Sequence, residues 1–180
     1  MKHVSQIFVI GTTMALLSAC GNKQSDATNP VSTASPQNVV EARDNKGFQT
    51  TEVTEFNSPW AMTFLPDGRL LVTEMAGTLH LYDPVSNTTG DIRGVPEVEH
   101  VAQGGLGDVV LHPGYATNSQ VYISYVERGE GGLGAAVARA QLALDDQGGG
   151  ALEDLEVIWR QTPKKSGDGH FGYRIAFDKD

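Results

Sequence analysis

The chain has 180 residues, which suits one ordinary domain and excludes two large ones. Its 13 Lys and Arg residues against 22 Asp and Glu residues give a formal charge of −9. Nucleic-acid binding depends on cations that displace counterions from phosphates, so we do not expect this acidic chain to bind nucleic acid. Glycine accounts for 21 residues, well above the usual share of about 7%, which favours a turn-rich fold over a coiled coil.

The first 19 residues have the pattern of a bacterial lipoprotein signal peptide. Lys2 supplies a positive start, residues 7–17 are mostly apolar, and the motif Leu17-Ser18-Ala19-Cys20 matches a lipobox. Lipid attached to Cys20 would anchor an exported protein to a membrane. Gly21, in place of Asp, favours the outer membrane facing the periplasm. The alternative is an ordinary signal peptide in which Cys20 is an incidental buried thiol.

A tether and a folded body follow the signal peptide. Residues 20–47 are rich in Asn, Ser, Thr, Gln, Ala and Pro and show no sustained period, so we expect a flexible tether there. Residues 48–180 carry the aromatic residues of the mature chain and form the expected domain. Cys20 is the only cysteine, which excludes an intramolecular disulfide.

Short strands separated by tight turns dominate the body. Residues 62–65 form a short apolar run that ends at Pro66-Asp67-Gly68, a turn pattern because proline fixes φ and glycine accepts positive φ. Residues 70–73 resume a strand, and residues 79–83 alternate apolar and polar side chains. Further strands are expected at residues 108–111, 121–126 and 135–144, and another strand starts at 174–177.

The strand pattern repeats. Phe64, Leu111 and Phe177 hold equivalent places, at spacings of 47 and 66 residues. Repeats of this size, with about four short strands each, are typical of β-propeller blades. A β-sandwich with similar hairpins is the alternative. Propellers close with about four to eight blades. We therefore expect the chain to be the N-terminal part of a longer all-β polypeptide, with two blades, the start of a third and uncovered blade surfaces.

Two clusters could carry chemistry. Gly-rich residues 103–108 lead into a strand and would present Gln103, whose amide both donates and accepts hydrogen bonds. Alternatively, Gln103 only satisfies loop carbonyls. Residues 168–174 precede another strand, and His170 there could exchange a proton near neutral pH or have a structural role. Arg174 could pair with an anion or brace a blade edge.

Several other chemistries are disfavoured. The Gly-rich segment matches neither common phosphate-binding motif, and a strand follows it where a helix N-terminus is needed. His80, His100 and His112 lie too far apart in sequence to form a local zinc motif. No G-x-S-x-G nucleophile elbow is present.

Four groups of motifs, spread over about residues 52–180, resemble the soluble quinoprotein glucose and aldose sugar dehydrogenases. They are Ser58-Pro59-Trp60-Ala61-Met62 with Leu65-Pro66-Asp67-Gly68; Gln103-Gly104-Gly105-Leu106-Gly107-Asp108 with Leu111-His112-Pro113; Val121-Tyr122-Ile123-Ser124-Tyr125; and His170-Phe171-Gly172 with Arg174.

The resemblance implies a six-bladed propeller that holds pyrroloquinoline quinone (PQQ) and Ca²⁺. Such enzymes oxidise the C1 hydroxyl of aldoses to lactones and pass the electrons to an external acceptor. By resemblance His170 is the general base and Gln103 contacts sugar and cofactor, while the calcium ligands are expected beyond residue 180. The protein supplies orientation and a base, and the cofactor carries the redox chemistry.

Two departures refine this expectation. Glucose-specific members have Asp directly before the histidine, whereas Gly169 stands here with Asp168 one position earlier, which favours the broader aldose branch. Tyr173 replaces a small residue, usually Gly. The alternatives are a non-redox propeller that binds sugar or peptide, and a metal-dependent propeller lactonase. This chain alone is expected to be inactive.

Overall fold

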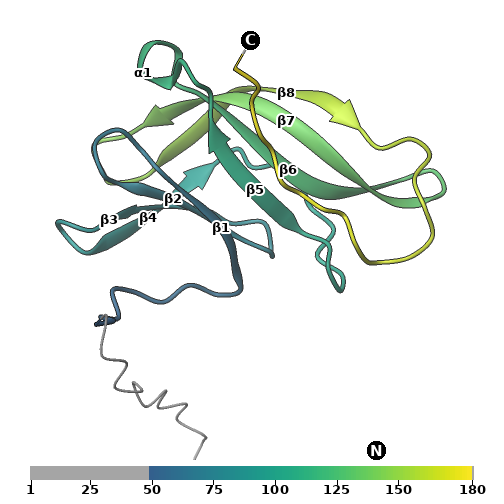
Figure 1. Ribbon diagram of the computed structural model, residues 1–180, viewed down its shortest axis with the longest axis horizontal. Helices are drawn as coiled ribbons and strands as arrows, with labels where there is room; N and C mark the ends of the chain where they lie inside the picture. The colour runs from purple at the N-terminus through teal and green to yellow at the C-terminus, as the bar shows by residue number, and fades with distance from the viewer. Residues whose placement is uncertain (1–48, 180) are drawn as a thin grey trace, which may run out of the picture. The chain divides into compact units, whose positions relative to one another are not determined.

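A computed structural model describes residues 49–179, and nearly every regular element in this part of the chain is a strand (Figure 1). The expected signal peptide, Cys20 and the whole expected tether lie outside the described residues. The elements are β1 (Pro59–Phe64), β2 (Leu70–Glu74), β3 (Leu79–Asp83), β4 (Thr88–Arg93), β5 (Leu106–Leu111), α1 (Tyr115–Asn118), β6 (Gln120–Gly129), β7 (Gly132–Leu144) and β8 (Gly150–Arg160).

The strands form two antiparallel meanders of four, β1 to β4 and β5 to β8. Short turns allow this arrangement because antiparallel neighbours need only a few connecting residues. Between β1 and β2 the Leu65 N–H donates to Arg69 O at 2.7 Å, and Gly68 takes a φ of 90°. The proline, aspartate and glycine turn read from the sequence is therefore confirmed.

The two meanders meet at both edges. Their last strands, β4 and β8, pair in parallel, with Ile92 opposite Gly150. On the other side, β5 lies against β1 and β2. The Leu106 N–H donates to O of Met75, the residue after β2, at 3.0 Å, and Thr73 Oγ1 of β2 donates to Gly107 O at 2.8 Å. The eight-stranded sheet, in the order β1-β2-β3-β4-β8-β7-β6-β5, therefore folds back so that one meander stacks on the other.

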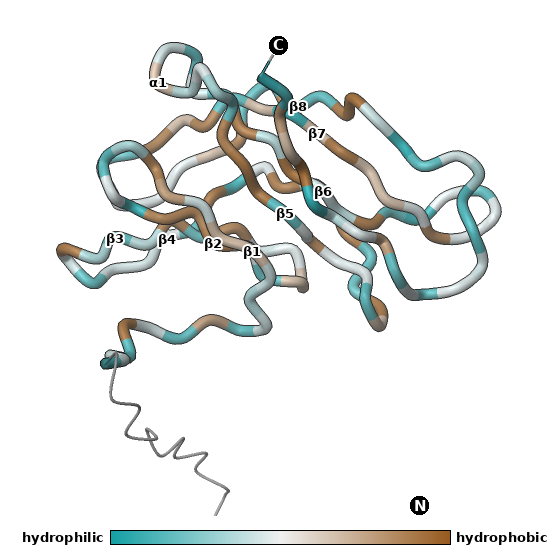
Figure 2. Tube along the Cα trace, in the orientation of Figure 1, coloured by the Kyte–Doolittle hydropathy of each residue, from teal (hydrophilic) through white to brown (hydrophobic). Residues whose placement is uncertain are grey.

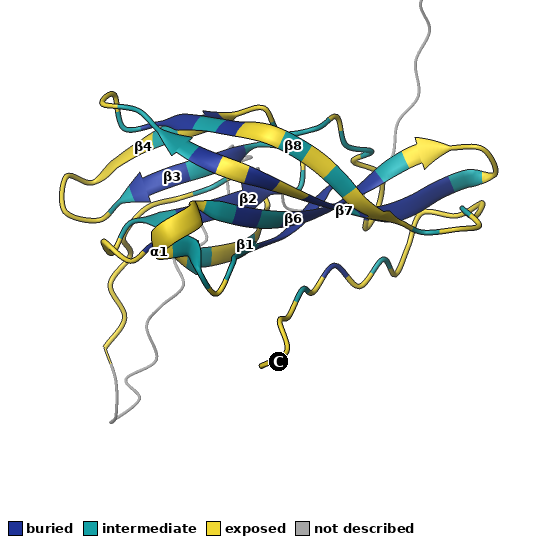
Figure 3. Cartoon of the chain, turned by 90° about the horizontal axis from the view of Figure 1, so that it is seen from above, coloured by how far each residue is buried: buried dark blue, intermediate teal, exposed yellow. Residues whose placement is uncertain are grey.

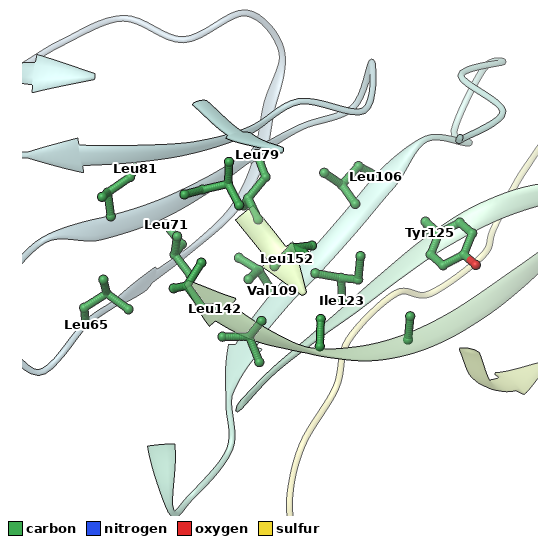
Figure 4. Close-up of a cluster of buried hydrophobic side chains, with 14 of the residues drawn as sticks. Leu65, Leu71, Leu79, Leu81, Leu106, Val109, Ile123, Tyr125, Leu142 and Leu152 are labelled. Carbon is green, nitrogen blue, oxygen red and sulfur yellow. The ribbon is translucent and has the colours of Figure 1, made fainter. Parts of the chain in front are cut away.

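The hydrophobic core fills the space between the stacked meanders (Figure 4). Leu71 and Leu79 from the first meander and Leu106 from the second have no exposed surface. Burying one such side chain contributes about 1.5–3 kcal/mol. Fifteen buried residues form this cluster: Leu65, Leu71, Leu79, Leu81, Ile92, Leu106, Val109, Val121, Ile123, Tyr125, Ala136, Ala138, Ala140, Leu142 and Leu152.

Strand β7 shows how the sequence selects the buried face. Ala138, Ala140 and Leu142 are buried, whereas Arg139 and Gln141 between them are exposed. Successive side chains of a strand point to opposite faces, so this alternation puts one face against the core. Figure 3 shows the same contrast along the strands, with buried segments in β3, β6 and β7 and exposed segments in β4 and β8.

An apolar surface of the first meander remains open. Trp60, Met62 and Phe64 alternate along β1 and are 50%, 63% and 61% exposed. With Val53 and Phe56 they border a groove over β1 and β2. Figure 2 shows hydrophobic stretches along β2 in the first meander and β5 in the second. The uncovered blade surface expected from the sequence is thus present.

Three strand assignments differ from the sequence analysis. Strands β4 and β8 were not singled out, because β4 is mostly polar and acidic residues interrupt β8. The strand start predicted at residues 174–177 has no ladder partner among residues 49–179 and forms no strand there. Its Ile175 N–H instead donates to the side chain of Asp108 at 2.8 Å.

Candidate active site at the Gln103 and His170 loops

Two loops with equivalent places in the fold carry the candidate residues. Residues 94–105 connect β4 to β5 and contain Gln103, whereas residues 161–173 follow β8 and contain His170. Each loop therefore leaves the last strand of a meander. Although 67 residues separate them in sequence, the two loops are in direct contact.

Gln103 is held at three atoms by the second loop. Its side-chain Oε1 accepts the His170 backbone N–H at 2.7 Å. Its backbone N–H donates to Asp168 O at 3.1 Å, and its backbone O accepts the Tyr173 hydroxyl at 2.8 Å. The side-chain oxygen of Gln103 thus holds the backbone N–H of His170, and not a loop carbonyl as one interpretation of the sequence expected.

His170 adopts an unusual backbone conformation. Its φ is 59°, in the left-handed region that residues other than glycine rarely occupy. Such conformations persist where surrounding contacts hold the backbone in place, and they are often found at functional sites. The bond to Gln103 supplies part of that constraint, and the exposed His170 remains open to a ligand.

A buried polar network supports the second loop. Ser124 Oγ, on β6, donates to Tyr173 O at 2.7 Å and accepts the Asp108 N–H at 2.9 Å. The carboxylate of Asp108 accepts the Ile175 N–H, and Arg174 Nε lies 3.8 Å from it. Buried polar groups need such partners because an unpaired one is costly. The network fixes the chain on both sides of Tyr173.

Tyr173 lies between the two loops and strands β1 and β5. Its ring packs edge-on against Trp60, with ring centroids 5.5 Å apart, and touches the backbone of Gly107 closely enough to leave no room for a Cβ there. Burial raises the pKa of Tyr173 to about 12. Its hydroxyl therefore remains a protonated donor at neutral pH.

A cavity of about 160 Å³ opens beside this network. Trp60, Asp108, Gly172, Tyr173 and Arg174 line it. The Arg174 side chain is 82% exposed and makes only a long contact to Asp108, so most of its donors stay available to an anion. Arg174 thus offers donors to carbonyl or carboxylate oxygens at this cavity, whereas Gln103 and His170 are not among the residues that line it.

Two other histidines, His80 and His112, have polar partners. His80 Nδ1 lies 2.9 Å from an Asp91 oxygen and His80 Nε2 lies 3.3 Å from a Glu74 oxygen. His112 Nδ1 accepts the Gly114 N–H at 2.9 Å within a turn. In the described part of the chain, no three His, Cys, Asp or Glu side chains gather as metal ligands. No helix within residues 49–179 is long and apolar enough to cross a membrane.

Sequence reasoning missed the residues beneath the site. Ser124 gave no local indication because it is a single serine in an apolar strand, and its partners Asp108 and Tyr173 come from distant segments. Trp60 was quoted only as part of a motif. A partial indication was Gly107 in the Gly-rich segment, since a glycine between strands often marks a close approach of another group.

The two stacked meanders, whose following loops are in contact through Gln103 and His170, define two blades of an all-β propeller. This is also the class of the similar solved structures. A glucose dehydrogenase crystal structure is 42% identical, with a TM-score of 0.63, and the match covers 68% of this chain and 35% of that one. The sequence model of the family described as Glucose / Sorbosone dehydrogenase matches residues 56–180, and the chain belongs to that family.

Two further relatives extend the comparison. The aldose sugar dehydrogenase YliI of Escherichia coli (strain K12) is 38% identical over 126 residues, which are 69% of this chain and 33% of that protein. A PQQ-bound aldose sugar dehydrogenase from Streptomyces coelicolor is 26% identical, with a TM-score of 0.50, over 62% of this chain and 33% of that one. The chain thus spans about a third of the length of the relatives it matches.

Proposed function

We propose that the polypeptide containing this chain oxidises aldose sugars at C1 to lactones, with PQQ as cofactor and an external electron acceptor. Family membership supports the sugar dehydrogenase class, and a PQQ-bound relative supports the cofactor. The observation that carries the proposal is the contact between Gln103 and His170, because it joins the two predicted site residues from separate blades.

The roles of the two residues follow from their surroundings. His170 is the general base that takes the proton of the C1 hydroxyl, since histidine changes its charge near neutral pH and His170 is exposed at the loop surface. Gln103 uses Oε1 to hold the His170 backbone, which leaves its amide nitrogen to donate to the sugar or the cofactor.

The guanidinium of Arg174 suits an anionic quinone, because it can donate hydrogen bonds to carboxylate oxygens. Arg174 is mostly exposed at the rim of the cavity, next to the loop of His170. When bound, PQQ supplies a quinone that accepts two electrons from the sugar. We place the ligands of Ca²⁺ in the part of the polypeptide beyond residue 180.

Two features support further parts of the proposal: the exposed apolar surface on β1 supports additional blades, and the N-terminal motif supports a membrane anchor. A further blade would cover Trp60, Met62 and Phe64, since adjoining blades of a propeller bury each other's faces. A closed ring of six blades places the His170 loop near the central channel. The lipobox at Cys20 would export the protein and anchor it to the outer membrane, facing the periplasm.

Reconstitution tests the activity. The full polypeptide, loaded with PQQ and Ca²⁺, should reduce an artificial electron acceptor when xylose, glucose or galactose is added. His170→Ala should lower kcat by about 10²–10⁴-fold, the usual contribution of a general base. His100→Ala is the matched control because His100 is an exposed histidine of the Gln103 loop. It should keep normal turnover.

Two results would contradict the proposal. Unchanged turnover in His170→Ala would remove the base from the mechanism. Hydrolysis of a lactone without added quinone, together with no acceptor reduction by any aldose, would replace the dehydrogenase with a lactonase.

A further inference from the structure

We propose that Tyr173 is a positioning residue, which holds Gln103 and His170 in one fixed arrangement for the oxidation of the sugar. This inference rests on the proposed function, because it assigns Tyr173 a role in the same site. Tyr173 acts through Gln103, whose backbone oxygen accepts its hydroxyl at 2.8 Å.

The contact closes a ring of interactions around Gln103. The Tyr173 hydroxyl fixes the carbonyl of Gln103, Asp168 O accepts its N–H, and His170 donates to its side chain. All three partners lie within six consecutive residues of the second loop. A shift of Tyr173 would therefore move the carbonyl of Gln103 and, through its side chain, the backbone of His170.

Tyr173 is itself fixed at both ends. Its backbone oxygen accepts the Ser124 hydroxyl at 2.7 Å, and its ring is wedged between Trp60 and Gly107. Ser124 belongs to β6 and Gly107 to β5, so strands of the second meander hold Tyr173 in place beside the two loops. A ring locked by packing provides the rigid support that a site of defined geometry needs.

The backbone of Tyr173 indicates that its side chain has a specific role. Its φ is 60°, a conformation that glycine adopts at little cost and that tyrosine adopts rarely. The ring and hydroxyl contacts offset this disadvantage. Burial raises the pKa of Tyr173 to about 12, so the hydroxyl stays a donor throughout the neutral range.

Tyr173→Phe tests the hydroxyl with the ring kept in place. In the full polypeptide loaded with PQQ and Ca²⁺, the His170 amide should exchange its hydrogen about tenfold faster. The value of kcat for an aldose should fall about tenfold, while KM stays within about twofold. Tyr122→Phe is the matched control, since its hydroxyl also donates to a glutamine, Gln120, at 3.1 Å. It should change neither the exchange rate nor kcat.

Gly107→Ala tests the ring from the opposite side. The three atoms nearest to a methyl group at residue 107 would all belong to Tyr173, and two of them lie in its ring. The substitution should therefore raise His170 amide exchange in the native background. In a Tyr173→Gly background the collision is gone, and adding Gly107→Ala should change the exchange rate less than twofold. This cycle isolates the contact between the two residues.

The outcomes separate this inference from the proposed function. Normal exchange and normal kcat in Tyr173→Phe would overturn the positioning role, as would a drop in stability alone with kcat unchanged. An equal effect of Gly107→Ala in both backgrounds would also overturn it. Absence of sugar oxidation by the unsubstituted, cofactor-loaded protein would instead reject the proposed function, whatever the exchange rates show.

Discussion

Ser124→Ala removes one hydroxyl that joins the candidate site to the core. Ser124 is 2% exposed, and its Oγ both donates to Tyr173 O at 2.7 Å and accepts the Asp108 N–H at 2.9 Å. The substitution leaves a carbonyl and an N–H without partners, and both belong to buried residues.

The expected loss of stability follows from these two groups. A buried donor or acceptor left unsatisfied costs about 1–3 kcal/mol. With two such groups and some local relaxation, we expect Ser124→Ala to lower the free energy of unfolding by about 2–4 kcal/mol. That is a large fraction of the roughly 5–15 kcal/mol that stabilises an ordinary domain.

Urea unfolding of the polypeptide that carries this chain measures the effect. Ser86→Ala is the matched control, because Ser86 is exposed and its hydroxyl pairs with the hydroxyl of Thr88. Its backbone N–H, which donates to Asp83 at 3.4 Å, is kept in the variant. We expect the control to lie within about 0.5 kcal/mol of the unsubstituted protein. A loss below about 0.5 kcal/mol for Ser124→Ala would refute the reasoning, since both buried groups would then have found other partners.

Two further predictions concern the core and the site at alkaline pH. Leu71→Ala should lower the free energy of unfolding, measured by calorimetry, by about 2–5 kcal/mol because Leu71 is fully buried. Val85→Ala is the control and should show no such loss, since Val85 is 94% exposed. The pKa of Tyr173 is raised from 10.0 to about 12 on folding, so its contribution to stability is complete below pH 10 and is lost as the pH rises through 12. Unfolding free energies at pH 9 and pH 11.5 should therefore differ less in Tyr173→Phe than in the unsubstituted protein, and an equal difference would refute the assignment.

The sequence was informative where local chemistry decides the structure. Six strands could be predicted because alternating apolar residues and turn residues specify them locally: β1, β2, β3, β5, β6 and β7. Strands β4 and β8 could not, because both carry many polar residues. Their parallel pairing, with Ile92 opposite Gly150, depends on how the two meanders stack.

Motifs and side-chain chemistry are properties of the chain, so Gln103 and His170 could be named as candidates from the sequence. The bond from the His170 N–H to Gln103 and the bond from the Tyr173 hydroxyl to Gln103 arise only in the folded chain. The physical reason is that these contacts join segments about 70 residues apart. Their geometry is set by the packing of one blade on the next and by the absence of a side chain at Gly107.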